Sequence, residues 1–191
     1  MPLLTLEPFV SPDDLFGDAA RPPAEGRWWV LHTRPRAEKR LARELLRHRR
    51  SFFLPLFTRT WRSRGTTLSS HLPLFPSYVF LHGDGEARWT ALETNQVAQV
   101  IPVEDQRQLH DDLVRVHHLM VSGLPLSPEE RLEPGTAVEI TRGPLAGLTG
   151  KVLKNGKGLR VLVEVRLLQQ GVSAEIESWM LRVVPLSRPP R

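Results

Sequence analysis

The sequence contains no cysteine, so disulfide bonds, thiolate nucleophiles and cysteine-ligated metal sites are excluded. Lysine is scarce as well: only four of the 26 basic residues are lysines, and the other 22 are arginines. No apolar run approaches the roughly 18 residues that a membrane-spanning helix needs. The stretch from Met1 to Val10 lacks the basic start of a secretory signal. We therefore expect a cytoplasmic protein without a membrane partner.

The composition is that of a folded, basic protein. The 191 residues carry a formal net charge of +5, and 40% are hydrophobic against 25% charged. This length fits one large domain or two small ones. Arginine's planar guanidinium pairs with phosphate or carboxylate through two hydrogen bonds, so the arginine excess favours a nucleic acid or another polyanionic partner. A GC-rich genome would also raise arginine over lysine, and composition leaves both explanations open.

Sequence signatures of catalysis are lacking. The chain has no phosphate-binding P-loop, no nucleophile elbow and no dinucleotide-binding glycine motif. His110 and His117 do not have the HExxH spacing of a zinc site, so we interpret them as surface histidines of a helix. We therefore expect no enzyme, no metal and no cofactor.

The N-terminal part predicts an α+β fold. Residues 1–26 are rich in proline and acidic side chains, which is typical of a flexible lead-in. Residues 27–123 mix apolar strand-like runs with helical spacing and predict helices packed on a mainly antiparallel sheet. The expected strands are 28–33, 52–61, 68–75, 77–82 and 97–103, and the expected helices are 36–48, 86–93 and 110–120.

The C-terminal part has a different texture. Residues 124–134 combine proline with charge and predict a linker. Residues 135–185 hold five short β segments separated by glycine, asparagine or serine, which predicts a small five-stranded β-barrel. Helix propensity is poor there, so we expect a permanent barrel. Residues 186–191 are expected to be a tail.

Three stretches stand out by their residues. WVLHTRP at 29–35 runs into the first expected helix, PLFPSYVFL occupies 73–81, and GPLAGLTG at 143–150 lies between Gly135 and Lys151. In this order they resemble the NusG/RfaH family of transcription factors: its opening strand and first helix, its LFPGYVFV segment and its KOW motif. The resemblance covers residues 28–184.

The resemblance implies an N-terminal domain of the family's NGN type, which binds the clamp helices of RNA polymerase. It also implies a C-terminal, SH3-like KOW barrel that recruits a second partner. The implied function is transcription elongation and antitermination without catalysis, through suppressed pausing and termination. We expect a monomer and a specialised paralogue rather than the housekeeping protein. A ribosome- or RNA-associated KOW protein without a polymerase role is the alternative hypothesis.

Aromatic residues around the PLFPSYVFL segment are the candidate polymerase contacts. Strand alternation sends Tyr78 and Phe80 to one face of the sheet and their neighbours to the other. Tyrosine suits an interface anchor because it combines apolar area with a polar tip. Packing in the core is the other explanation for these aromatics. The resemblance assigns Phe75, Tyr78 and Phe80 to polymerase binding, and Val97 and Val103 are expected nearby.

Arginines recur on one side of the expected helix 36–48. At about 100° per residue they fall together, opposite the apolar face. Such a row can follow phosphates without reading sequence, and a solvated face is the other explanation. The resemblance implies that this region faces the non-template DNA strand, beside a loop in which Gln96 replaces the family's usual glycine. The candidate nucleic-acid-binding residues are Arg34, Arg36, Arg40, Arg43, Arg47, Thr94 and Asn95.

A basic hairpin tip is expected within residues 58–70, where three arginines accompany Trp61. Charge beside a stacking platform is a weak signature of single-stranded nucleic-acid binding. A hairpin that only caps the sheet explains the pattern equally well.

In the KOW-like segment, Leu145 and Leu148 lie between glycines that permit tight turns. A leucine exposed at a loop tip indicates a protein partner, and the resemblance implies ribosomal protein S10 or Rho. Plugging of the barrel end by both leucines is the other explanation.

Overall fold

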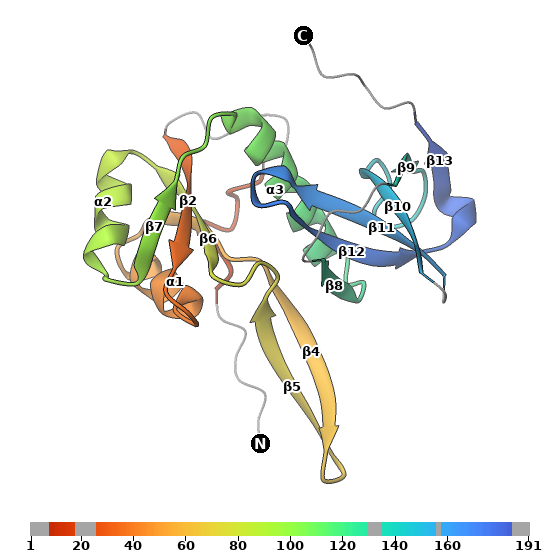
Figure 1. Ribbon diagram of the computed structural model, residues 1–191, viewed down its shortest axis with the longest axis horizontal. Coiled ribbons are helices and arrows are strands. Elements are labelled where there is room, and N and C mark those ends of the chain that lie inside the picture. The colour runs from red at the N-terminus through yellow and green to blue at the C-terminus, as the bar shows by residue number, and fades with distance from the viewer. Residues whose placement is uncertain (1–7, 18–25, 130–134, 156–157, 185–191) are drawn as a thin grey trace. The chain divides into compact units, whose positions relative to one another are not determined.

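The computed structural model describes residues 8–17, 26–129, 135–155 and 158–184 (Figure 1). The chain folds into two compact units, Met1–His110 and Asp111–Arg191. Helix α3 (Gln106–Val121) begins in the first unit and ends in the second. None of the described helices is long and apolar enough to cross a membrane.

The first unit is built on a five-stranded sheet in which every neighbouring pair of strands is antiparallel. The predicted combination of helices with an antiparallel sheet is therefore confirmed. In sheet order the strands are β1 (Val10–Ser11), β3 (Ser51–Phe53), β6 (Tyr78–Gly83), β2 (Arg27–Thr33) and β7 (Val97–Ile101).

The central strands β2 and β6 are buried on both faces. Leu31 stands opposite Val79 on one face, and both side chains are fully buried. Trp28 and Val30 point to the other face and are 1% and 0% exposed. Because side chains alternate along a strand, an unbroken apolar run such as WWVL needs cover on both sides.

Two helices, α1 (Glu38–Arg47) and α2 (Gly85–Glu93), cover one face of this sheet (Figure 1). Leu41 and Leu45 of α1 join the central strands in one buried cluster. The start of α2 is capped by Asp84, whose carboxylate accepts a hydrogen bond from the Ala87 N–H at 2.9 Å and satisfies a donor left over at the helix end. The amphipathic helix predicted at 36–48 is confirmed as α1.

An aromatic cluster fills the opposite face. The rings of Phe16 and Phe53 meet edge-on with centroids 4.9 Å apart, and those of Trp28 and His82 do the same at 4.9 Å. The ring quadrupoles favour this geometry. His110 lies 6.2 Å from the Trp28 ring and is 0% exposed. Its interpretation as a surface histidine is therefore wrong, because α3 carries its side chain into this cluster.

Part of the predicted flexible lead-in has defined structure. Residues 8–17 contribute β1, which pairs with β3, and the buried side chains of Leu15 and Phe16. These apolar residues are flanked in the sequence by acidic residues, and their side chains are buried against the sheet. The remaining parts of the lead-in, residues 1–7 and 18–25, lie outside the described residues, as does the tail at 186–191.

Strands β4 (Leu56–Ser63) and β5 (Thr66–Pro73) form a separate hairpin that extends away from the sheet (Figure 1). Ser63 pairs with Thr66, so the turn consists of Arg64 and Gly65, with φ values of 47° and 79°. Two residues with positive φ match the twist of a hairpin. The predicted hairpin with a basic tip is confirmed.

The second unit contains a six-stranded antiparallel sheet. Its edge strands do not pair with each other in the described residues, so the predicted closed five-stranded barrel is not confirmed. In sheet order the strands are β13 (Leu181–Val183), β9 (Thr136–Ile140), β10 (Thr149–Asn155), β11 (Gly158–Val165), β12 (Gln170–Ile176) and β8 (Leu126–Glu129), with the short 3-10 helices η1 (Arg166–Leu168) and η2 (Ser178–Met180).

The sixth strand comes from the segment that the sequence predicts as a linker. β8 pairs with β12, with Leu126 opposite Ala174. Pro128 fits there because an edge strand tolerates the missing N–H on its open side. Residues 130–134 of the predicted linker lie outside the described residues, and the linker at 124–134 stays a prediction.

Replacing Leu41 with Ala should lower the free energy of unfolding by about 2–5 kcal/mol, because a fully buried side chain leaves a cavity in the α1 face. The matched control is Leu46→Ala on the same helix, where the side chain is 40% exposed and a loss of about 0.5 kcal/mol is expected. Urea unfolding followed by tryptophan fluorescence measures both variants. Equal losses would contradict the assignment of the buried face.

Candidate functional site

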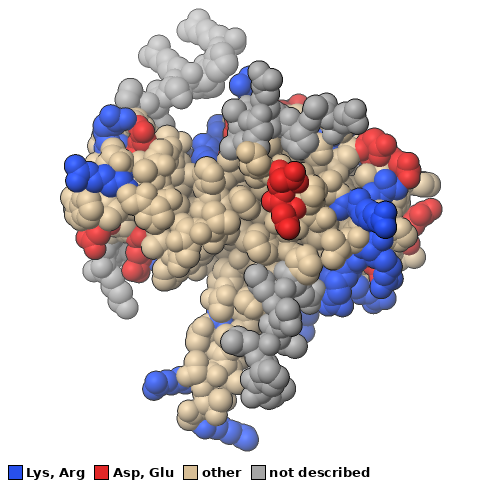
Figure 2. Space-filling model, turned by 180° about the vertical axis from the view of Figure 1, so that it is seen from behind, with Lys and Arg blue, Asp and Glu red and all other residues tan. Residues whose placement is uncertain are grey.

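The arginine row predicted from the sequence lies on the solvent side of α1. Arg34, Arg36, Arg40, Arg43 and Arg47 are all exposed. Figure 2 shows Lys and Arg gathered over the region of α1. The apolar residues of the helix are buried against the sheet, so the two faces separate as the helical spacing predicts.

One carboxylate lies among these arginines. Glu44 accepts from the Arg47 guanidinium, with an N–O distance of 2.9 Å between side chains that are 28% and 71% exposed. Solvent screens an exposed pair of this kind strongly, so it contributes little to stability and is easily exchanged for a phosphate. The row therefore retains an excess of positive charge.

The start of α1 is tied to the turn before β6. The Glu38 carboxylate, 7% exposed, accepts a hydrogen bond from the Ser77 N–H at 2.7 Å. The Ser77 carbonyl in turn accepts from the Thr33 N–H at 2.8 Å. These hydrogen bonds connect the end of β2, the beginning of α1 and the residue before Tyr78.

The loop after α2 is bonded to the segment between β2 and α1. The Arg34 N–H donates to the Gln96 carbonyl at 2.8 Å, which brings the first arginine beside this loop. The Thr94 hydroxyl donates to the Ala91 carbonyl at 2.7 Å, whereas Asn95 is exposed and has a φ of 59°. The Gln96 side chain donates to the Thr94 carbonyl at 2.9 Å and braces the loop. Of the loop residues, Asn95 is the one directed to solvent.

The candidate polymerase contacts do not form one exposed patch. Phe75, Phe80 and Val103 are 1%, 0% and 5% exposed, and the two phenylalanine rings meet edge-on at 6.0 Å. Tyr78 and Val97 are half-buried, but Val97 packs toward the core on the α1 side. Strand alternation correctly predicts that Tyr78 and Phe80 share a face, whereas their different burial depends on what packs over them.

Tyr78 is the accessible aromatic of this group. Its ring lies 5.2 Å from that of His32 on the neighbouring strand. Its backbone N–H donates to the Phe75 carbonyl at 3.2 Å. The ring therefore packs beside His32, the backbone is fixed by the turn, and part of the side chain remains in contact with solvent.

The β4–β5 hairpin carries a second basic surface. Arg59, Arg62 and Arg64 are exposed, Trp61 is 42% exposed, and no Asp or Glu occurs between residues 56 and 73. Alternation places Arg59 and Trp61 on one side of the ribbon and Arg62 on the other. The residues predicted from the sequence to bind nucleic acid do not include this surface. The arginines beside Trp61 were the sequence feature that pointed to it.

In the second unit, the leucines expected at a loop tip point inward. Leu145 and Leu148 are 3% and 4% exposed. The backbone closes around them: Gly143 and Gly147 have φ values of 82° and 87°, and the Gly147 N–H donates to the Ile140 carbonyl at 2.7 Å. Glycine adopts this backbone without strain. Partner binding by these leucines stays a prediction.

Two histidines have pKa values shifted by their surroundings. Burial lowers the pKa of His82, and the neighbouring His110 lowers it further. Burial lowers the pKa of His117, with a smaller contribution from His118. Within the described ranges, no group of three or more His, Asp or Glu side chains is placed to hold a metal ion.

Known proteins that resemble this chain were found in a family comparison and in a structure comparison. A family model described as "Transcription termination factor nusG" matches residues 26–117. No curated protein matches the chain. Nineteen chains of solved structures match it. One of them, described as "Domain interaction in Thermotoga maritima NusG", is 15% identical with a TM-score of 0.46, and the alignment covers 87% of this chain and 99% of that one.

Stability should fall on acidification below the ordinary histidine pKa of about 6.5. The folded protein holds His82 neutral because its pKa is lowered, whereas the unfolded chain takes up the proton, so the unfolding free energy is complete above that pH and declines below it. One such group contributes a slope of up to about 1.4 kcal/mol per pH unit.

Urea unfolding of the protein and of His82→Phe, on both sides of that pH, measures this slope. The variant should show a smaller decline, with the remainder coming from groups such as His117. An unchanged slope would contradict the role of His82.

Proposed function

Residues 26–117 belong to the NusG family, and from this premise we propose that the chain is a transcription elongation factor that binds RNA polymerase and opposes pausing and termination. Beyond the family match, the proposal is carried by the exposed arginine row of α1, which continues into the Arg34–Gln96 contact. The protein acts by binding alone: it holds polymerase and DNA in a productive arrangement, and no bond is made or broken.

Polymerase docking is assigned to the surface around Tyr78, at the start of the central strand β6, with the polymerase clamp helices as the proposed partner. A tyrosine that is already supported by its neighbours loses little rotational freedom on binding. Phe75, Phe80 and Val103 support this surface from the core, whereas Val97 lies on the α1 side of the sheet. In this proposal Tyr78 carries the contact itself.

The arginine row is proposed to follow the backbone of the non-template DNA strand. Arg36, Arg40 and Arg43 contribute charge that positions the strand without reading its sequence. Asn95, exposed at the end of the row, offers an amide to a nearby base edge, while the hydroxyl of Thr94 is engaged with the backbone. Glu38 supports both functions because it ties α1 to the turn before Tyr78.

The C-terminal segment 135–185 is proposed to be a KOW-like module that recruits a second protein, with ribosomal protein S10 and Rho as the candidate partners. Support comes from the GPLAGLTG turn, where the buried Leu145 and Leu148 hold the loop in place from inside. The loop between them carries Ala146 and Gly147, which are exposed, so a partner can reach this surface.

Replacing Tyr78 with Ala should weaken retention of core RNA polymerase by the full-length protein about tenfold, the loss typical of a central aromatic anchor. Trp89→Ala is the matched control, since this exposed aromatic on α2 lies away from the proposed contact. A pull-down across polymerase concentrations measures both variants, and thermal unfolding checks that they remain folded. Equal retention of polymerase by Tyr78→Ala and the parent protein would show that docking lies elsewhere.

Replacing Arg40 and Arg43 with Gln should weaken binding to single-stranded DNA of the non-template sequence and reduce its salt dependence. Each lost phosphate contact lowers the slope of log affinity against log salt by about 0.7, so the double variant should lose about 1.4. Arg142→Gln with Arg182→Gln removes the same charge from exposed positions in the second unit. If both double variants lose the same slope, the effect is one of net charge and the row is not the DNA track.

A further inference from the structure

The second unit contains a pocket of about 380 Å³ whose lining is unusually cationic. Arg115 from α3, Lys151 from β10 and Arg166 from η1 line it, against a single carboxylate, Glu164. Formal charges among these four side chains therefore leave an excess of two positive charges. Leu145 and Leu148 do not line this pocket, although Thr149 and Gly150 at the end of the same turn do.

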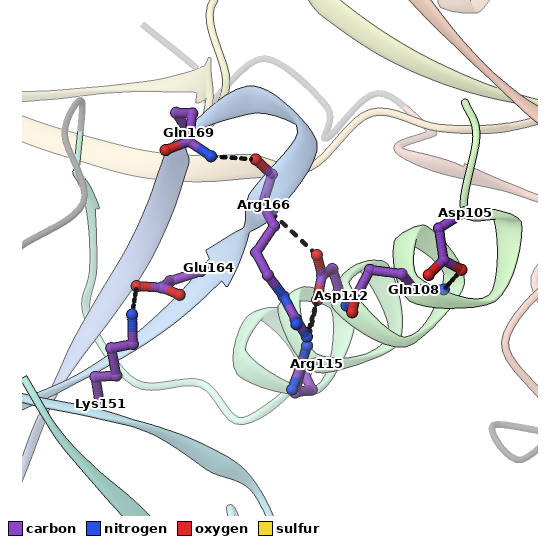
Figure 3. A network of polar contacts seen from close by, with 8 residues as sticks. All are labelled: Asp105, Gln108, Asp112, Arg115, Lys151, Glu164, Arg166 and Gln169. Carbon is purple, nitrogen blue, oxygen red and sulfur yellow. Dashed lines mark hydrogen bonds and ion pairs between the residues drawn. The ribbon is translucent and has the colours of Figure 1, made fainter. Parts of the chain in front are cut away.

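Asp112 organises the two arginines. Its carboxylate is 1% exposed and accepts hydrogen bonds from the Arg115 guanidinium and from the Arg166 backbone N–H, the latter at 3.0 Å (Figure 3). The Arg166 guanidinium approaches the same carboxylate at 3.4 Å. Burial raises the pKa of Asp112, and the hydrogen bond from the Arg166 backbone and the two arginine charges oppose that shift. One buried carboxylate thus holds two guanidinium groups at the pocket.

The cations keep donors that their partners do not use. Lys151 donates to Glu164 at 2.6 Å, which engages one of its three protons (Figure 3). The Arg166 side chain is 52% exposed, and its contact with Asp112 is long. The Arg115 side chain is 26% exposed, so part of it is accessible from the pocket. Arginine forks of this kind match a carboxylate in plane.

The floor of the pocket is aliphatic. Its accessible apolar surface comes from the half-buried Ala137 and Val184, while Val138, Leu162 and Val163 are almost fully buried beneath. No aromatic side chain is among the lining residues. Nucleic-acid sites normally stack bases on aromatic rings, which this pocket does not offer. An aliphatic floor beneath arginines suits a peptide that presents an acidic side chain next to an apolar one.

We propose that this pocket binds an acidic peptide segment of a protein partner, with the peptide carboxylate on Arg115 and Arg166 and a neighbouring aliphatic side chain on the floor. Lys151 steers the negative charge, and Glu164 limits the affinity by opposing it. Every residue that forms this site belongs to the second unit.

The test measures binding of a fluorescein-labelled peptide, in which aspartate alternates with leucine, to the full-length protein by fluorescence anisotropy. Arg166→Gln should weaken binding about tenfold, the loss of one charge-assisted hydrogen-bond contact. The backbone N–H of residue 166 still reaches Asp112, so the variant should fold. Arg182→Gln, an exposed arginine that also pairs with a glutamate at 2.6 Å, is the matched control and should bind as the parent protein does.

A second variant tests the site in the opposite direction. Glu164→Gln removes the only carboxylate of the lining and should tighten peptide binding about threefold, since less negative charge opposes the ligand. Tighter peptide binding by Glu164→Gln would support the proposed site even if Arg166→Gln proves unstable. A peptide with asparagine in place of aspartate should bind at least about tenfold more weakly.

Three results would overturn the proposal. They are equal losses for Arg166→Gln and Arg182→Gln, no gain for Glu164→Gln, or equal binding of the asparagine peptide. A short oligouridylate that displaces the peptide and binds more tightly would identify the surface as a nucleic-acid site instead.

Discussion

The antiparallel pairing of β2 with β6 places apolar side chains on both faces of the central sheet, and the first unit is arranged around covering them. One face is covered by α1 and α2 through residues such as Leu41, and the other by an aromatic cluster that includes Phe16 and Trp28. Burial of this area is the main stabilising contribution available to a small domain without disulfide bonds.

The proposed binding surfaces lie where this cover ends. The buried face of α1 fixes the direction in which its arginines point, and the buried Glu38 carboxylate fixes the helix against the turn that precedes Tyr78. A DNA track and a protein anchor would then share one rigid support, which is the arrangement that precise positioning needs. The β4–β5 hairpin differs, because β4 is exposed from Thr58 to Ser63 and carries its arginines there without a covering layer.

The second unit contains a buried carboxylate, that of Asp112, whose charge is compensated by neighbouring donors. Asp112 is almost inaccessible to water, yet two guanidinium groups and a backbone N–H compensate its charge. Removing one partner from such a cluster lowers the free energy of unfolding by more than the intact cluster adds to it. The cluster therefore fixes the positions of its members more than it stabilises the fold. Its consequence is that Arg115 and Arg166 are held together at the pocket beside an aliphatic surface.

By itself the sequence determined the local patterns: the apolar strand run at WWVL, the arginine and leucine faces of α1, the basic hairpin tip within residues 58–70 and the shared face of Tyr78 and Phe80. These follow from the 3.6- and two-residue repeats and from turn chemistry. Only the tertiary structure decided which of those faces is covered. Burial of Phe80, of Leu148 and of the α3 histidine depends on what another segment brings over them, as does the pairing of β8. A repeat specifies a side chain's direction, whereas its exposure depends on contacts distant in the chain.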